Sequence, residues 1–286
     1  MSLKDFVRES DVRERLMAEF ETPFVAATPD LRAPPLTKNY SLVGTAFDYL
    51  LRFYIERLNP GAKTRTWIAE EAAFGEVGVG DELISLDEIV NKAKRQYKDY
   101  LLSGNVTDDL LAATLKLGQL DPLRRRGDLF WDSSFFGKLG RIDPLDITDL
   151  KQLIALVNPD LFRAAKCAIL NPAFGRASHM MGGADCDLVI DDTLLEIKTT
   201  KRFAIEREYF NQLIGYYLLS RIGKIAGAPP AHSIRKLGIY FSRFGYLWTF
   251  DVTRAITESR LAHLTSWFKK RAQESKRTSP WGSTDL

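Results

Sequence analysis

The first half of the chain carries apolar residues at the spacing of α-helices. From 39 to 58, apolar side chains recur every three or four residues and predict an amphipathic helix, which ends at Asn59-Pro60-Gly61. Residues 1–20 show a similar pattern and predict another helix, whereas the four prolines between 22 and 37 predict an extended strap. From 62 to 165, helical stretches alternate with Gly, Pro and Asp breaks, so we expect an all-helical insertion there.

The pattern changes after Lys166, where short apolar runs are bounded by Gly and Asp. The runs CAILNPAF, DCDLVI and LLEIKTT predict strands. A helix from 204 to 221 follows, and KLGIYFSRFGYLWTFDV then predicts a hairpin before a basic amphipathic helix that runs through about 271. We therefore predict an α/β fold with a mixed-sheet core flanked by helices. Its parts are an N-terminal helix and strap (1–38), a first core helix (39–61), the helical insertion (62–165), the main core (166–272) and a polar tail (273–286).

Composition narrows the class of protein without identifying it. The 286 residues are 45% apolar and 27% charged, which is ordinary for a soluble globular chain and excludes wholesale disorder. The charged opening residues lack the apolar stretch of a secretory signal, and the apolar runs are too short to cross a bilayer. Only two cysteines are present, which is typical of a reducing compartment, so we expect a cytoplasmic protein without a membrane partner.

The charge of the chain gives only weak information about a partner. A net charge of +3 is unremarkable for a soluble surface. Basic residues cluster at 124–126 and again between 260 and 277. Either cluster could contact phosphates or could be solvated surface, and both interpretations stay open.

The side chains with catalytic potential gather on one predicted hairpin, DCDLVIDDTLLEIK. A two-residue turn at Asp191-Asp192 pairs Leu188 with Leu195. Because side chains alternate between the two faces of a strand, the polar and apolar positions of this hairpin separate onto opposite faces. The polar face then carries Asp185, Asp187, Glu196 and Lys198.

Three carboxylates and a lysine at one end of an apolar hairpin favour a metal site. Burying such charges is costly unless they are paired or bound to a cation. Mg²⁺ or Mn²⁺ suits oxygen ligands and keeps coordination positions for water and for phosphate oxygens. The pattern therefore favours metal-dependent hydrolysis of a phosphodiester. The alternative is a surface hairpin stabilised by cross-strand Asp–Lys and Glu–Lys pairs.

Asp187 and the triplet Glu196-Ile197-Lys198 resemble the signature of the PD-(D/E)XK nuclease superfamily. Asp187 matches the acidic residue of its second core strand, and the triplet matches the E-X-K of the third. The resemblance implies a restriction-endonuclease-like core in which Asp187, Glu196 and the Ile197 carbonyl hold Mg²⁺ or Mn²⁺. The metal then polarises the scissile phosphate and acidifies a bound water, while Lys198 orients or deprotonates that water.

Two further motifs resemble the RecB-like branch of that superfamily. Its members carry Q-x-x-x-Y on a downstream helix, which Gln212 and Tyr216 match. They also carry G-T-x-x-H on the first core helix, where this chain has GTAFD, so that Asp48 replaces the histidine. The resemblance implies that Gln212 binds phosphate or fixes Lys198, and that Asp48 is a metal ligand. Alternatively, Asp48 forms an ion pair with Arg52 on an exposed helix edge.

The resemblance implies a Mg²⁺-dependent deoxyribonuclease that acts in defence, repair or recombination in a prokaryote or phage. The chain contains no G-x-x-x-x-G-K-[ST] motif, so any motor would be another chain. A further hypothesis is that a protein partner supplies targeting and this chain is the nuclease subunit. A competing hypothesis is a nucleic-acid-binding or scaffolding protein that keeps the fold without cleaving. Asp185 is either a second metal ligand or a strand-end residue paired with Lys198, which the same register places opposite it. If Asp187 points away from the site, Asp185 takes its role as a ligand.

Overall fold

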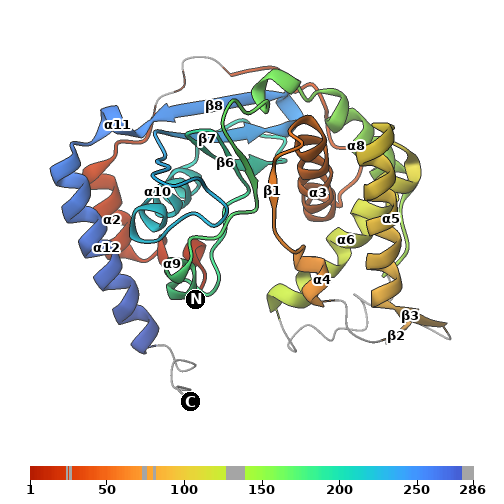
Figure 1. Ribbon diagram of the computed structural model, residues 1–286, viewed down its shortest axis with the longest axis horizontal. Coiled ribbons are helices and arrows are strands. Elements are labelled where there is room, and N and C mark those ends of the chain that lie inside the picture. The colour runs from red at the N-terminus through yellow and green to blue at the C-terminus, as the bar shows by residue number, and fades with distance from the viewer. Residues whose placement is uncertain (24, 26–27, 73–75, 80–81, 127–138, 279–286) are drawn as a thin grey trace.

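A six-stranded mixed sheet forms the centre of the molecule (Figure 1). The computed structural model describes residues 1–23, 25, 28–72, 76–79, 82–126 and 139–278. The strands lie in the order β1-β4-β5-β6-β7-β8, and the fold is therefore α/β with an open sheet flanked by helices. The strands are β1 (Lys63–Thr64), β4 (Ala168–Leu170), β5 (Leu188–Ile190), β6 (Thr193–Lys198), β7 (Lys236–Phe241) and β8 (Tyr246–Asp251).

Strand directions follow from the connections between the strands. Neighbours run antiparallel except for β1 with β4 and β6 with β7, which are parallel. Helix α10 (Arg207–Ile222) lies between β6 and β7 in the chain and provides the crossover that a parallel pair needs. The hairpin of β5 and β6 has Leu188 opposite Leu195. This is the predicted register.

One face of the sheet is covered by helices from residues 40–155. Figure 1 shows α3, α5, α6 and α8 together on this side. Side chains at alternate positions of β5 and β6, Leu188 and Leu195 among them, are buried in one core with Phe47 and Leu50 of α3. The helices are α3 (Tyr40–Leu58), α4 (Ile68–Ala72), α5 (Leu86–Ser103), α6 (Asp108–Arg126) and α8 (Pro144–Ala155).

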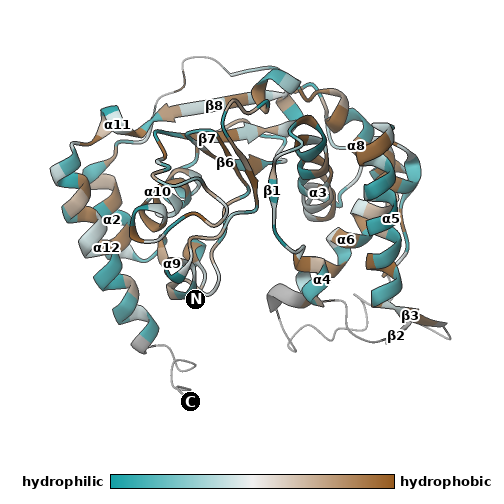
Figure 2. Ribbon diagram, in the orientation of Figure 1, coloured by the Kyte–Doolittle hydropathy of each residue, from teal (hydrophilic) through white to brown (hydrophobic). Residues whose placement is uncertain are grey.

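The other face packs against α10 and against helices that include those at the two ends of the chain. The intervening positions of the same strands, such as Val189 and Leu194, are buried with Phe210 and Leu213 of α10. Figure 2 shows apolar strands between helices whose outer sides are hydrophilic, as this two-sided burial requires. The helices are α1 (Leu3–Phe6), α2 (Ser10–Glu19), α9 (Arg176–Met180), α11 (Val252–Ala255) and α12 (Glu258–Thr278), besides α10.

The prediction of an all-helical insertion was wrong. Residues 62–165 contain β1, which extends the central sheet, and a separate hairpin of β2 (Glu76–Val79) and β3 (Glu82–Ser85). β1 has only two residues, both exposed, so it leaves no alternating pattern in the sequence. The side chains of the basic cluster at 124–126 lie outside the described residues.

Both ends of the chain also differ from prediction. The single N-terminal helix is two helices, because α1 ends at Phe6 and α2 begins at Ser10. Ser2 and Asp5 form a capping box that starts α1. At the other end α12 continues to Thr278, inside the predicted polar tail, and residues 279–286 lie outside the described part.

Asp191 holds the β5–β6 turn against the chain that precedes β4. It has a φ of 51°, and its carboxylate accepts backbone N–H bonds from Ala165, Lys166 and Cys167 at 2.9, 2.6 and 3.1 Å. Burial opposes ionisation, but these donors outweigh it and lower the pKa of Asp191.

We expect Asp191→Asn to lower the free energy of unfolding by about 1 kcal/mol at neutral pH. Asparagine tolerates the positive φ. Its side chain, however, has one acceptor oxygen, whereas the Asp191 carboxylate offers two oxygens to the three N–H donors. Because the folded pKa of Asp191 is depressed, its contribution is present above the unfolded pKa of about 4 and is lost as the pH falls through the folded pKa. Urea unfolding should therefore show that the difference in unfolding free energy between wild type and Asp191→Asn becomes smaller as the pH is lowered. A difference that does not change with pH contradicts the assignment.

Candidate active site

β6 brings Glu196 and Lys198 to the face of the sheet that α10 covers. The two residues alternate with Ile197, whose side chain joins the core on the opposite face. The Lys198 Nζ atom donates to Glu196 Oε1 at 2.7 Å and to Gln212 Oε1 on α10 at 3.4 Å. Gln212 Nε2 in turn donates to the hydroxyl of Tyr216, one helical turn further on, at 3.0 Å. The E-X-K and Q-x-x-x-Y residues thus form one connected group.

Asp187 lies immediately before β5, at the end of the same hairpin. Its Oδ2 atom accepts the backbone N–H of Ile197 at 2.6 Å. Burial and the negative charges of Glu196 and Asp48 raise the pKa of Asp187 well above its ordinary range, against the N–H donor and Lys198. Asp187 therefore lies in the electrostatic field of two other carboxylates.

Asp48, on α3, is the second carboxylate whose negative charge raises the pKa of Asp187. Its Oδ2 atom forms an ion pair with Arg52 at 2.6 Å, which is the predicted i,i+4 interaction. The alternative interpretation placed this pair on an exposed helix edge, but Arg52 is only 6% exposed and Asp48 is half-buried. The Asp48–Arg52 pair therefore belongs to the candidate site.

Asp185 departs from the predicted face. The β5 ladder begins at Leu188, and Asp185 instead bridges to Ala173. The register that places Asp185 opposite Lys198 is therefore not formed, because the β5–β6 ladder ends at the Leu188–Leu195 pair. The Lys198 Nζ atom instead donates to Glu196 and Gln212.

The charges of the candidate site do not balance. Asp48 is paired with Arg52 and Glu196 with Lys198. Within the described residues, Asp187 accepts the neutral backbone N–H of Ile197 and lies in the field of Lys198. The Glu196 Oε2 atom is buried and has no hydrogen-bond partner among the described residues. An unbalanced negative charge and a buried oxygen without a donor fit the requirements of a divalent cation, which prefers hard oxygen ligands.

The side chains are not arranged as a finished metal site. No group of three or more His, Cys, Asp or Glu residues in the described part of the chain is placed to hold a metal ion. Asp48 belongs to α3, which covers one face of the sheet, and Glu196 lies on the face that α10 covers. Their charges act on Asp187, but two of the carboxylates are engaged by Arg52 and Lys198.

Two neighbours of the site were missed in the sequence. The ring of Tyr209 lies 4.8 Å from Lys198 Nζ, a cation–π contact, and the ring of Tyr49 lies 4.5 Å from the Arg52 guanidinium. Tyr209 is three residues before Gln212 on α10, so helical spacing alone could have placed it beside the motif. Tyr49 is likewise three residues before Arg52 on α3, so the same spacing could have placed its ring there. Its hydrogen bond to Asp121 of α6 could not be found this way.

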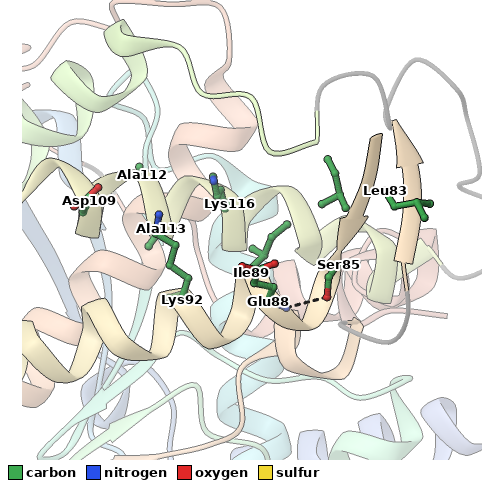
Figure 3. A pocket seen from close by; sticks show the side chains of 11 residues that line it. Leu83, Ser85, Glu88, Ile89, Lys92, Asp109, Ala112, Ala113 and Lys116 are labelled. Carbon is green, nitrogen blue, oxygen red and sulfur yellow. Dashed lines mark hydrogen bonds between the residues drawn. The ribbon is translucent and has the colours of Figure 1, made fainter. Parts of the chain in front are cut away.

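The open cavity in Figure 3 lies away from these residues. Its volume is about 320 Å³, and it lies between β3, α5 and α6. Ile84 and Ile89 contribute apolar lining, and Lys92 and Lys116 contribute charged groups. None of the candidate site residues lines it. The candidate active site is therefore the group of Asp187, Glu196 and Lys198, because reactive side chains and not the volume of a cavity determine the chemistry of a site.

No family model, curated protein or solved structure matches this chain. Its function is therefore inferred from its own residues. Within the described ranges, no helix is both long and apolar enough to span a membrane.

Proposed function

We propose that this chain is a metal-dependent nuclease with a RecB-like, restriction-endonuclease-like core that hydrolyses phosphodiester bonds, in DNA by preference. The observation that carries the proposal is the position of Asp187, whose carboxylate lies in the field of Glu196 and Asp48 while Lys198 adjoins Glu196 at 2.7 Å. Carboxylates beside a lysine at the end of a hairpin are the parts that a two-strand D…E-X-K site requires. The preference for DNA and the role in defence, repair or recombination follow from the resemblance alone.

The proposed metal ligands are Asp187, Glu196, the Ile197 carbonyl and Asp48. When bound, Mg²⁺ or Mn²⁺ supplies polarisation of the phosphate and a water of lowered pKa. Glu196 links this group to the lysine that follows it by two residues, so ligand and lysine are placed together by the period of the strand.

Lys198 acts in this proposal as a charged donor. Burial lowers its pKa, but the Glu196 carboxylate outweighs burial and raises the pKa of Lys198 above its ordinary value. The ammonium therefore stays protonated at neutral pH, orients the attacking water and offsets charge on the phosphate. Gln212 accepts from the ammonium and is itself fixed by Tyr216, so it positions Lys198.

The C-terminal basic residues contribute less to nucleic-acid binding than their number indicates. Arg260 pairs with Glu19, and Arg271 pairs with Glu9 and Asp11. These arginines hold α12 against α2 and against Glu9, the residue immediately before α2. Phosphate contacts are therefore expected from other basic residues and from a protein partner.

A specific observation favours the alternative function, a nucleic-acid-binding or scaffolding protein that does not cleave. Arg52 and Lys198 already neutralise Asp48 and Glu196, and aspartate stands where RecB-like members have histidine. A fold that keeps these pairs permanently would bind nucleic acid without a metal.

Cleavage assays separate the two functions. The purified chain is incubated with linear, circular and single-stranded DNA and with RNA, in Mg²⁺, Mn²⁺ or EDTA. We expect cleavage that requires the metal and that is lost in Glu196→Ala and in Lys198→Ala, since each removes one part of the group. Cleavage that both variants retain contradicts the site, and binding without cleavage in either metal supports the alternative.

A further inference from the structure

A polar pocket of about 520 Å³ lies between the last turn of α10, the segment 225–234 before β7 and one side of α12. The two helices lie side by side (Figure 1). Arg221 and Lys269 contribute positive charge to the lining, and serine and threonine side chains contribute hydroxyl groups. None of the described residues that line the pocket is an aspartate or a glutamate. The candidate active-site residues do not line it either, so the pocket is a separate feature of the molecule.

The side of α12 that faces the pocket carries mostly short side chains. Four residues of α12 line the pocket at the three- and four-residue spacing of one helix face: Ala262, Thr265, Ser266 and Lys269. The neighbouring stripe, which includes Leu264 and Phe268, is buried in the core and holds the helix in place. Because three of the four lining residues are short, α12 leaves a hollow beside α10, with Lys269 at one end of the stripe.

His232 belongs to the wall of the pocket and has one ring nitrogen without a partner. Its Nδ1 atom lies 3.9 Å from Cys167 Sγ, whereas its Nε2 atom is buried and has no hydrogen-bond partner among the described residues. The hydroxyl of Thr265 is also buried and unpartnered in that part of the chain. Buried polar atoms are nearly always paired, so a small rotation of each side chain would let oxygen atoms of a bound group satisfy both. Water meets the same need, and the charges decide what the pocket binds.

The charges of the lining favour an anion. Lys269 forms no ion pair within the described residues, and Arg221 pairs with Glu258, whose side chain is 72% exposed and does not line the pocket. The last turn of α10 acts against these cations, because the C-terminal end of a helix carries about half a negative elementary charge. One full ammonium charge and one partly screened guanidinium charge exceed that half charge.

The apolar part of the wall indicates a ligand with an organic part. Ile222, Ile225 and Ile234 line the pocket beside the charged and hydroxyl groups. A volume of about 520 Å³ is in the range of sites that hold small organic ligands, and it is far more than a bare phosphate ion needs. Cations and hydroxyl groups beside an apolar wall suit a phosphate ester, whose phosphate oxygens accept several hydrogen bonds while its organic part covers the isoleucines.

We propose that the pocket between α10 and α12 binds the phosphate group of a phosphate ester, either a free nucleotide or a nucleotide of a nucleic-acid strand. Lys269 and Arg221 contact the phosphate, and the organic part lies against the isoleucines. The inference goes beyond the proposed cleavage activity and holds whether or not the chain cuts nucleic acid.

Histidine NMR signals give a readout at the pocket itself. The chain has only three histidines, so the ring signals of a histidine-labelled sample can be assigned with His179→Gln, His232→Gln and His263→Gln. Adenosine monophosphate is titrated into the whole chain in EDTA at constant pH and ionic strength, with adenosine as the probe that lacks the phosphate. The His179 signal is the internal control, because His179 does not line the pocket.

We expect adenosine monophosphate to shift the His232 signal to saturation and adenosine to leave it unchanged. Lys269→Gln should weaken the binding by about fivefold, since it removes one charged donor, whereas Lys270→Gln, which does not line the pocket, should change it by less than about twofold. Ala262→Leu should abolish the binding, because the larger side chain fills the hollow. A His232 signal that does not saturate, equal binding of adenosine, or equal losses in the two lysine variants overturns the inference.

A single-stranded oligonucleotide distinguishes the two sources of the phosphate. If the oligonucleotide shifts His232 and competes with adenosine monophosphate, the pocket takes a nucleotide of a nucleic-acid strand. If only the mononucleotide binds, the ligand is a free nucleotide, and both results support the phosphate site. Because these titrations contain EDTA, their failure overturns the inference alone, and loss of metal-dependent cleavage in Glu196→Ala and Lys198→Ala remains the separate test of the proposed function.

Discussion

Asp187→Asn is expected to lower the rate of Mg²⁺-dependent DNA cleavage by about three orders of magnitude and to stabilise the metal-free protein. Asparagine keeps an oxygen that can accept the Ile197 N–H, so the local structure should survive. It removes the charge that Glu196 and Asp48 repel, and with it an anionic metal ligand. Single-turnover cleavage and urea unfolding in EDTA measure the two effects.

The stabilisation by Asp187→Asn should depend on pH in a defined direction. Burial, Glu196 and Asp48 raise the pKa of Asp187, so the folded state holds this proton more tightly than the unfolded state does. Wild-type stability therefore falls as the pH rises above the unfolded pKa of about 4, up to the folded pKa, whereas the asparagine cannot titrate. The advantage of the variant should be larger at about pH 8 than at about pH 4.

Asp185→Asn is the matched control, since Asp185 is the alternative ligand. It should leave cleavage within about threefold of wild type, as is usual for a residue outside the reacting group. If Asp185→Asn abolishes cleavage and Asp187→Asn does not, the two roles are exchanged. An Asp187→Asn protein that is less stable at high pH contradicts the electrostatic account of the site.

Arg243→Met should cost about 3–5 kcal/mol of unfolding free energy. Arg243, in the 3₁₀ turn η3 (Ser242–Phe244), donates to both oxygens of Asp149 on α8 at 2.8 and 2.9 Å, and both side chains are 1% exposed. It also donates to the Ala33 carbonyl at 3.0 Å, while the Ala33 N–H donates to the Arg243 carbonyl at 2.9 Å. One residue thus fastens the proline strap to α8 and to the sheet, and its removal leaves a buried carboxylate without its cation.

The exposed pair Arg221–Glu258 gives the control for Arg243→Met. Arg221→Met should cost no more than about 1 kcal/mol, because solvent screens surface ion pairs. The double variant Arg243→Met/Asp149→Leu should recover most of the loss, since no unpaired charge remains. Urea unfolding of the four proteins measures this, and a loss below about 1 kcal/mol for Arg243→Met alone contradicts the role of the buried pair.

The hairpin could be predicted because its signals are local. The alternation of apolar residues and the Asp191-Asp192 turn determine the register that places Leu188 opposite Leu195. Asp185 could not be placed this way, because the β5–β6 ladder ends at Leu188 and Asp185 bridges to Ala173 on the other side of the hairpin. Alternation of side chains between two faces predicts positions only over the length in which a strand is paired with the adjacent strand.

The buried surroundings of the site could not be predicted from the sequence either, because they depend on contacts between residues that are far apart in the chain. The Asp48–Arg52 spacing predicts an ion pair, but its burial results from the helices of the insertion that cover it. Contacts such as Tyr49 with Asp121 join positions 72 residues apart in the chain. Such long-range contacts leave no periodic signal.

Anomalous scattering from crystals soaked in Mn²⁺ tests the central claim most directly. If this chain is a metal-dependent nuclease, the strongest anomalous peak lies within coordination distance of the Asp187 and Glu196 carboxylates, at about 2.0–2.3 Å, and is absent in Glu196→Ala. A peak elsewhere, or none at a Mn²⁺ concentration that supports cleavage, contradicts the claim.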